Sequence, residues 1–234
     1  MTDQHEPTTS QPRAPSEREI EAAHAIYTPR NLKLYDFVVH GFSNRFAWRC
    51  PTRALDAHYE TNLSSNHLEA AVGTGFFLER AKRPGFDRLT LLDINGSCLE
   101  EAERRLAGYG PDLLQASLFD PVPVSQPYDS VGLTYVLHCL PGAMTEKLAV
   151  IDNLKPAMHG ETVLFGATIL GQAIKPNLAA KALLSTYNRK GVFHNREDDF
   201  ASLAQGLRDR FDQVRVWQEG CVALFRAQGL GAGE

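Results

Sequence analysis

The sequence predicts an α/β protein, and two stretches support this fold class. The first runs from Leu68 to Gly75 and continues into the apolar residues 76–78, a pattern typical of a short strand, a glycine turn and a helix. The second is an apolar strand over residues 88–92 that ends in Asp93. Strands and helices then alternate along the chain, as they do in α/β proteins. The glycine turn is therefore expected to organise the fold.

This glycine turn has the composition of a nucleotide site. Gly73 and Gly75 permit positive φ angles and leave no Cβ between the main chain and a ligand. A turn between a strand and a helix also directs backbone N–H groups toward that ligand. A dinucleotide fingerprint would need a third glycine where Leu78 stands. Asp93, at the end of the next strand, can accept hydrogen bonds from both hydroxyls of a ribose.

An acid precedes the turn, and small residues follow it at every second position: Glu69, then Ala71, Gly73 and Gly75. This order, with Asp93 closing the next strand, resembles the first motif of class I S-adenosylmethionine-dependent methyltransferases, with alanine in place of the first glycine. The resemblance covers about residues 60–227. It implies a Rossmann-like, doubly wound α/β fold, whose seven-stranded, mostly parallel sheet ends in a C-terminal antiparallel hairpin. It also implies the cofactor S-adenosyl-L-methionine, bound by Glu69, Ala71, Gly73, Gly75, Asp93, Ile94, Ser117, Leu118 and Thr134.

Composition limits the partners and the location. The chain has 234 residues, 43% of them hydrophobic, and can bury one substantial core. A net charge of −4 offers no basic surface to a nucleic-acid backbone, so we expect no nucleic-acid partner. The four cysteines form no C-x-x-C pair, which predicts no zinc cluster and fits a cytoplasmic protein. No apolar run approaches the length of a membrane span, and the N-terminus is polar where a secretory signal would be apolar.

We expect three parts. Residues 1–17 are rich in Thr, Ser, Gln, Pro and charge, which predicts a disordered tail. Residues 18–60 are expected to form an N-terminal helical lid. Residues 61–229 would form the S-adenosylmethionine-binding domain, with a cap inserted at about residues 171–196. The aromatic side chains of the lid either pack on the sheet or roof an acceptor pocket, and the candidates for the second role are Tyr27, Tyr35 and Trp48.

The elements after the glycine turn follow from local signals. A helix is expected over residues 76–82, and the S-x-x-E capping box of Ser97 and Glu100 predicts that the next helix starts at Ser97. The other expected elements are a strand over 113–117, a strand over 128–136, a helix over 143–154, a strand over 162–167, a cap helix over 178–187, a helix over 199–207, and a hairpin of 211–217 with 221–225.

Two donor-site residues come from the end of the third strand. There Ser117 could reach the edge of an adenine, and the apolar Leu118 could pack on its face. A plain strand end is the alternative for each of them. Tyr187 and Asn195, in and after the cap helix, are candidates for contact with the methyl acceptor.

The chemistry of methyl transfer needs few protein groups. The reaction is an in-line displacement, and the protein mainly aligns donor and acceptor. A base helps only where the acceptor must lose a proton, and the candidates are His138 and His194. A structural or substrate-orienting role is the alternative for both histidines. The sequence contains no cluster of acids and histidines that would suggest a metal site.

The sequence therefore predicts an S-adenosylmethionine-dependent O- or N-methyltransferase that acts on a small, partly aromatic metabolite, such as one of secondary metabolism. The alternative is a protein that binds S-adenosylmethionine and cyclises or binds a natural product without methyl transfer. A chain with a degenerate donor pocket that serves as an interaction partner is a further alternative. The expected partner is a small-molecule acceptor, and a homodimer is compatible with the sequence.

Overall fold

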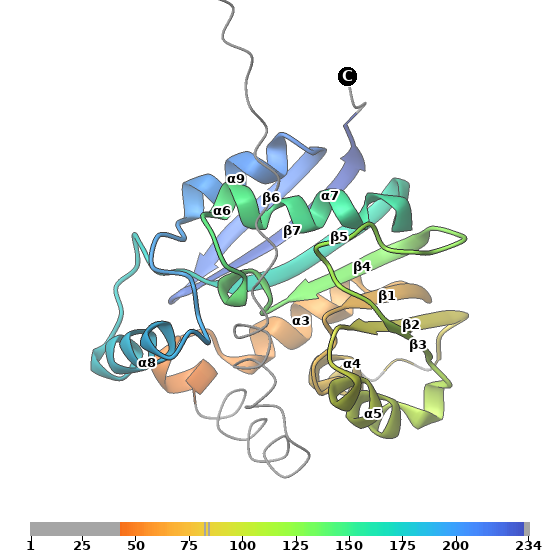
Figure 1. Cartoon of the computed structure of the whole chain (residues 1–234), viewed down its shortest axis with the longest axis horizontal. Coiled ribbons are helices and arrows are strands. Elements are labelled where there is room, and N and C mark those ends of the chain that lie inside the picture. The colour runs from red at the N-terminus through yellow and green to blue at the C-terminus, as the bar shows by residue number, and fades with distance from the viewer. Residues whose placement is uncertain (1–42, 82, 84, 232–234) are drawn as a thin grey trace, which may run out of the picture.

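In the computed structural model, which describes residues 43–231 except 82 and 84, seven strands form one sheet in the order β3-β2-β1-β4-β5-β7-β6 (Figure 1). Strands β1 to β5 pair in parallel, whereas β7 is antiparallel to both β5 and β6. The predicted Rossmann-like sheet with a C-terminal antiparallel hairpin is thus confirmed. The strands are β1 (Asn66–Ala70), β2 (Arg88–Asp93), β3 (Asp112–Gln115), β4 (Tyr128–Thr134), β5 (Met158–Ile169), β6 (Phe211–Glu219) and β7 (Val222–Leu230).

Helices cover both faces of this sheet, and each face has its own apolar core. One core gathers α6 (Met144–Lys147), α7 (Ala149–Leu154) and α9 (Phe200–Arg208) against the sheet. The other gathers α3 (Thr52–Asn62), α4 (Phe76–Arg80) and α5 (Gly96–Arg105). Short 3₁₀ helices stand at Ala107–Tyr109, Leu137–Cys139 and Lys155–Ala157. The described residues hold no helix that is long and apolar enough to cross a bilayer.

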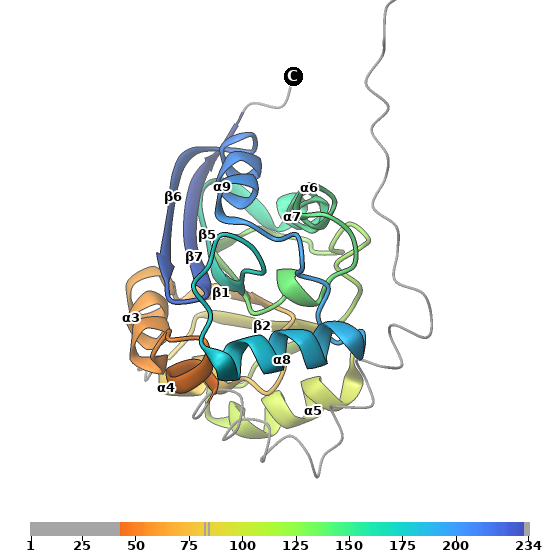
Figure 2. The same ribbon diagram turned by 90° about the vertical axis from the view of Figure 1, so that its left-hand side faces the viewer.

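The strand order reverses between β1 and β4, and the carboxyl ends of these strands mark the edge where open α/β sheets bind ligands. The glycine turn follows β1 at this edge, and Asp93 ends β2 beside it. Helix α8 (Leu178–Arg189) belongs to the segment that leaves β5 at the same edge. Figure 2 looks onto this edge and shows α8 lying across the front of the strand ends.

Several expected boundaries differ from the structure. Strand β3 ends at Gln115 and not at 117, and the hairpin strands β6 and β7 run on to Glu219 and Leu230. Helix α5 begins at Gly96 and not at Ser97, because the Asn95 side chain caps it by accepting the Ser97 N–H at 3.0 Å. The single helix expected over 143–154 is two helices, α6 and α7, that meet at Leu148. Strand β5 extends beyond the expected 162–167 at both ends. It begins at Met158, since Gly160 does not interrupt it, and it ends at Ile169. Tyr27 and Tyr35 lie outside the described residues.

Candidate active site

The glycine turn repeats a left-handed backbone at every second residue. Ala71 and Gly73 both have φ of +56°, and Gly75 has φ of +72°. A left-handed conformation costs an L-residue with a Cβ about 1–2 kcal/mol, and Ala71 accepts this cost. Gly75 caps the start of α4. The small residues at every second position of the motif therefore coincide with the positions that have a left-handed backbone.

The two glycines face different surroundings. A Cβ built at Gly75 would lie 3.1 Å from Leu106 Cδ1 and 3.3 Å from Ala102 Cβ, so this glycine lets the turn pack on α5. Among the residues that the structure describes, a Cβ at Gly73 would meet nothing within 4 Å. Gly73 thus borders open space, which a ligand can approach closely.

Asp93 connects the glycine turn to the end of β2. Its Oδ2 accepts the Gly73 N–H at 3.0 Å, and its Oδ1 accepts the Asn95 N–H at 2.9 Å. The carboxylate is buried, while the next side chain, Ile94, is exposed at the same edge. Asp93 therefore fixes the turn to the end of β2.

Glu69 lies buried below the turn and is held by two side chains. Its Oε1 accepts the Tyr59 hydroxyl at 2.6 Å, and its Oε2 lies 2.9 Å from His67 Nε2. His67 Nδ1 in turn lies 2.8 Å from the Ser130 hydroxyl. Burial and Glu69 together raise the pKa of Tyr59 far above its usual value, so the phenol keeps its proton and donates it.

Neighbours on β4 limit the position of the Glu69 carboxylate. A Cβ at Gly132 would overlap both of its oxygens, so only glycine fits there. Thr134 is buried two residues further along β4 near the Tyr59 hydroxyl, and its own Oγ1 has no hydrogen-bond partner among the described residues. These contacts bring the predicted residues Glu69 and Thr134 together around Tyr59.

The two predicted adenine residues have different environments. The Ser117 hydroxyl accepts the Phe119 N–H at 3.1 Å and shapes the turn after β3. Leu118 is buried in the core that holds α6, α7 and α9, and its carbonyl accepts a hydrogen bond from Asn153 at 2.9 Å. Leu118 is thus a packing residue on this face of the sheet, whereas Ile94 offers the exposed apolar side chain at the edge.

His138 is buried where the chain leaves β4. Its ring meets Phe193 edge to face at 4.5 Å between centroids. The Ile169 N–H donates to its Nδ1 at 3.4 Å, which leaves the ring proton on Nε2 in the neutral form. Burial, with a smaller contribution from Lys147, lowers the pKa of His138 to about 3. The ring is therefore neutral at ordinary pH, and the contact with the Ile169 N–H favours the tautomer with the proton on Nε2.

His194 lies beside His138, since its backbone N–H donates to the His138 carbonyl at 2.8 Å. Its Nε2 lies 3.1 Å from the Gly191 carbonyl, which can only accept, so Nε2 carries the proton and Nδ1 holds a lone pair. The half-buried Tyr187 ring lies 4.9 Å from Phe193. The structure thus gathers both predicted histidines and Tyr187 around Phe193.

Two of the predicted acceptor contacts are structural. Trp48 is buried in the core that holds α3, α4 and α5, and its carbonyl accepts the Cys221 N–H at 2.7 Å. Asn195 is fully buried; its amide donates to the Ile169 carbonyl at 2.9 Å and accepts from Asn188 at 2.8 Å. These contacts hold the chain in place and leave neither side chain at a surface.

Three residues that support these groups were not predicted from the sequence. Tyr59 and His67 hold Glu69, and Asn95 caps α5 beside Asp93. His67 stands two residues before Glu69 on the same strand, so the period of two places both on one face and could have identified it. Within the part of the chain that the structure describes, no three His, Cys, Asp or Glu residues gather as metal ligands would.

Comparison with known proteins identifies relatives along nearly the whole chain, although no family model matches. Demethylluteothin O-methyltransferase from Streptomyces thioluteus is 32% identical over 213 residues, which cover 90% of this chain and 93% of that protein. A physcion biosynthesis cluster O-methyltransferase from Aspergillus chevalieri is 35% identical over 216 residues, covering 91% and 96%. Among solved structures, the complex of DhpI with SAH superposes with a TM-score of 0.65 at 17% identity, covering 93% of this chain and all of that one (100%).

The likeness to DhpI shows the fold, and the identity with the two O-methyltransferases shows the family. The motif geometry agrees, because the small-residue turn and Asp93 meet at the ligand-binding edge of the sheet. The chain belongs to the class I S-adenosylmethionine-dependent methyltransferases.

Proposed function

We propose that this enzyme transfers a methyl group from S-adenosylmethionine to a hydroxyl oxygen of a small, flat, partly aromatic metabolite. The observation that carries the proposal is the arrangement at one sheet edge, where Gly73 borders open space beside Asp93 and the segment with His138 and His194 stands nearby. The names of the two relatives support oxygen as the acceptor atom and a metabolite as the acceptor. A nitrogen acceptor is the alternative that the test below addresses.

For the donor, the residues fit a ribose and an amino-acid end. Asp93 would accept from the ribose hydroxyls, and Ile94 would lie against the adenine. Ser117 would meet the edge of the base. The turn from Ala71 through Gly73 to Gly75 would hold the amino-acid end, with Glu69 and Thr134 below it. The donor supplies an electrophilic methyl group, and these side chains orient it.

On the acceptor side, the two histidines would have different roles, because a different ring nitrogen is engaged by the backbone in each of them. His138 would donate from Nε2 to an oxygen of the acceptor and orient it. His194 would accept the hydroxyl proton at Nδ1, because its Nε2 is already used by Gly191. As this proton moves, the acceptor oxygen forms the new bond to the methyl carbon, and the carbon–sulfur bond breaks with its electron pair on sulfur.

The surroundings favour a flat acceptor. Phe193 and Tyr187 stand beside the histidines, and aromatic side chains pack well on aromatic ligands. We further propose that the segment of residues 171–196 caps this acceptor, and that residues 61–229 form the donor-binding domain. The four cysteines are all free thiols, which supports a reducing, cytoplasmic location. We propose no nucleic-acid partner, since the net charge is −4.

The test is a product analysis with three flat probes that differ in the atom offered: 1-naphthol for a phenol, 4-hydroxycoumarin for an enol, and 2-naphthylamine for an amine. The proposal expects the first two to gain one methyl group from S-adenosylmethionine in mass spectrometry. Methylation of the amine alone would move the acceptor atom to nitrogen. Donor binding by calorimetry without any methylated product, or with an isomerised probe, would favour the binding or cyclising alternative.

A further inference from the structure

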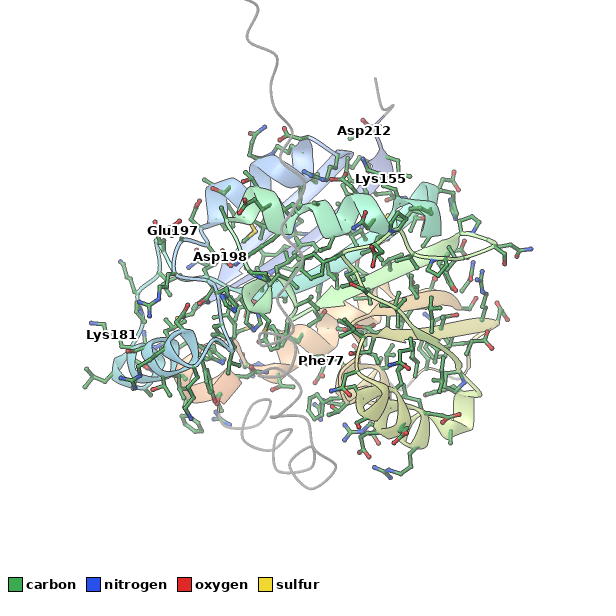
Figure 3. The ribbon with its side chains drawn as sticks, viewed as in Figure 1. Phe77, Lys155, Lys181, Glu197, Asp198 and Asp212 are labelled. Atoms are coloured by element: carbon green, nitrogen blue, oxygen red, sulfur yellow. The ribbon has the colours of Figure 1, made fainter. Side chains whose placement is uncertain are left out.

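An ion pair is buried where α6 meets the segment between α8 and α9. Lys147 Nζ donates to both carboxylate oxygens of Asp198 at 2.7 Å, and it also donates to the His194 carbonyl at 2.9 Å. Both side chains have no exposed surface (0%). Figure 3 shows Asp198 on the loop between α8 and the layer of α6 and α9. Separating the two charges would leave each of them buried without a partner, so the pair holds the two segments in contact.

The pair also holds the beginning of the same segment. The Asp198 carbonyl accepts the N–H groups of Gly171 and Gln172 at 2.9 and 3.0 Å. A Cβ at Gly171 would collide with the Asn195 carbonyl, so glycine lets the two ends of the segment touch. Lys147, Asp198 and Gly171, here called the insertion anchor, therefore tie residues 171 and 198 to α6 at one point.

The insertion anchor continues directly into the two histidines. His194, whose carbonyl is held by Lys147, donates its backbone N–H to the His138 carbonyl at 2.8 Å. Phe193, the preceding residue, packs on the His138 ring. A displacement of Lys147 would thus shift His194 and Phe193 relative to His138, while the Gly73–Asp93 contact lies on other elements.

A contribution to stability is a weak explanation for the buried Lys147–Asp198 ion pair. Burial raises the pKa of Asp198 to about 6 against the opposing effect of Lys147, and burial lowers the pKa of Lys147. Such a pair is often replaceable by apolar residues without loss of stability. Its three hydrogen bonds instead fix the position of a backbone carbonyl next to the acceptor side of the site.

We propose that Lys147 and Asp198 are positioning residues for the methyl acceptor: they hold His194 and Phe193 against His138 and so set acceptor binding, without a part in donor binding. This proposal rests on the proposed function, because it takes the histidine segment as the acceptor side. It assigns a role in the reaction to a buried lysine that touches neither substrate.

The test compares Lys147→Met with a control variant in the full chain. Arg210→Met breaks a second, less buried ion pair on the same layer, in which Arg210, two residues beyond α9, donates to Asp152 of α7 at 2.6 Å. A second variant, Lys147→Met with Asp198→Asn, removes the lysine without leaving an unpaired buried carboxylate. Each protein is assayed for melting temperature, affinity for S-adenosylmethionine, KM and kcat for 1-naphthol, and exchange of the Gly171, Gln172 and His194 amide hydrogens.

The proposal expects both Lys147 variants to exchange these three amides faster and to raise the KM for 1-naphthol roughly tenfold or more. Donor affinity stays within about twofold, and Arg210→Met changes the melting temperature alone. An unchanged KM, or an equal loss of donor affinity, would overturn the proposal. If the unmodified enzyme methylates no probe, the proposed function fails, and unchanged exchange at the three amides would still refute the insertion anchor.

Discussion

Tyr59 donates a 2.6 Å hydrogen bond to Glu69, and this bond joins helix α3 to the strand that carries the glycine turn. The carboxylate is buried and takes its second hydrogen bond from His67 at 2.9 Å. A buried carboxylate that loses a donor keeps its desolvation cost without the compensating bond. The position of Glu69 below the donor turn therefore depends on a residue outside the motif.

Tyr59→Phe should lower the free energy of unfolding by about 1.5–3 kcal/mol, the cost of removing a hydrogen bond to a charged group. It should also weaken S-adenosylmethionine binding, because the carboxylate below the turn is less firmly held. Urea unfolding and calorimetry measure the two effects. Tyr128→Phe is the control, since this buried hydroxyl donates to Thr90 away from the donor turn; equal donor affinity in both variants would contradict the coupling.

Asp93→Ala should bind S-adenosylmethionine at least tenfold more weakly, since each charge-assisted hydrogen bond contributes about 1.5–3 kcal/mol. The Gly73 N–H also loses its acceptor, so the turn itself loosens. Calorimetric titration gives the affinity, and Asp129→Ala serves as control because Asp129 pairs with His159 near the start of β4. Unchanged affinity in Asp93→Ala would refute the donor-site assignment.

Gly73→Ala and Gly75→Ala separate ligand contact from packing. Both changes place a Cβ on a left-handed residue and cost about 1–2 kcal/mol of strain. Only the Gly75 change adds contacts near 3.1 Å with α5, so it should be the less stable protein. Gly73→Ala should instead lose more donor affinity than stability. Thermal unfolding and donor titration on the same samples measure stability and donor affinity. A larger loss of stability in Gly73→Ala and a larger loss of donor affinity in Gly75→Ala would contradict the assignment.

Stability should fall as the pH is lowered, because buried histidines stay neutral in the folded chain and protonate in the unfolded one. The pKa of His138 is about 3 in the folded chain, far below the 6.5 of a free histidine, so the unfolded state binds more protons between these values. Going from about pH 7 to pH 5 should cost about 2 kcal/mol from His138. His58, with a pKa of about 4, adds to this loss.

His138→Gln should remove the His138 part of this dependence and leave the part from His58. Urea unfolding at the two pH values measures it. His159→Gln, at the surface, should keep the full dependence. The same slope in His138→Gln as in the unmodified enzyme would show that His138 is not held neutral by burial.

The fold was predictable because its signals are local. The small residues at 71, 73 and 75 indicate the left-handed turn, and Asp93 ends a strand in which three of the five preceding residues are leucines. The start of α5 was wrong because Asn95 and Ser97 are both good caps, and only the structure shows that Asn95 accepts the hydrogen bond. Gly160 suggested a break, yet β5 passes through it with an irregularity in the ladder: Met158 pairs with Tyr128 and Val163 with Ser130, so the register shifts between these two pairs.

The candidate site was less predictable because its support comes from distant parts of the chain. Lys147 and Asp198 are 51 residues apart, and nothing near either residue predicts their pairing. Trp48 and Asn195 were sensible acceptor contacts by residue type, but burial depends on the tertiary packing around them. Residue type thus indicated the chemistry, whereas the backbone contacts decided which side chains are available.

The central claim is that the carboxyl edge of the sheet holds an acceptor whose hydroxyl proton goes to His194. The most direct measurement is the single-turnover rate of 1-naphthol methylation by the unmodified enzyme, His194→Ala and His138→Ala, between about pH 6 and pH 9. The account predicts a loss of roughly 10²–10⁴-fold in His194→Ala, with the affinity for S-adenosylmethionine kept. Full turnover by both histidine variants across this range would contradict the assigned base and leave alignment alone as the source of catalysis.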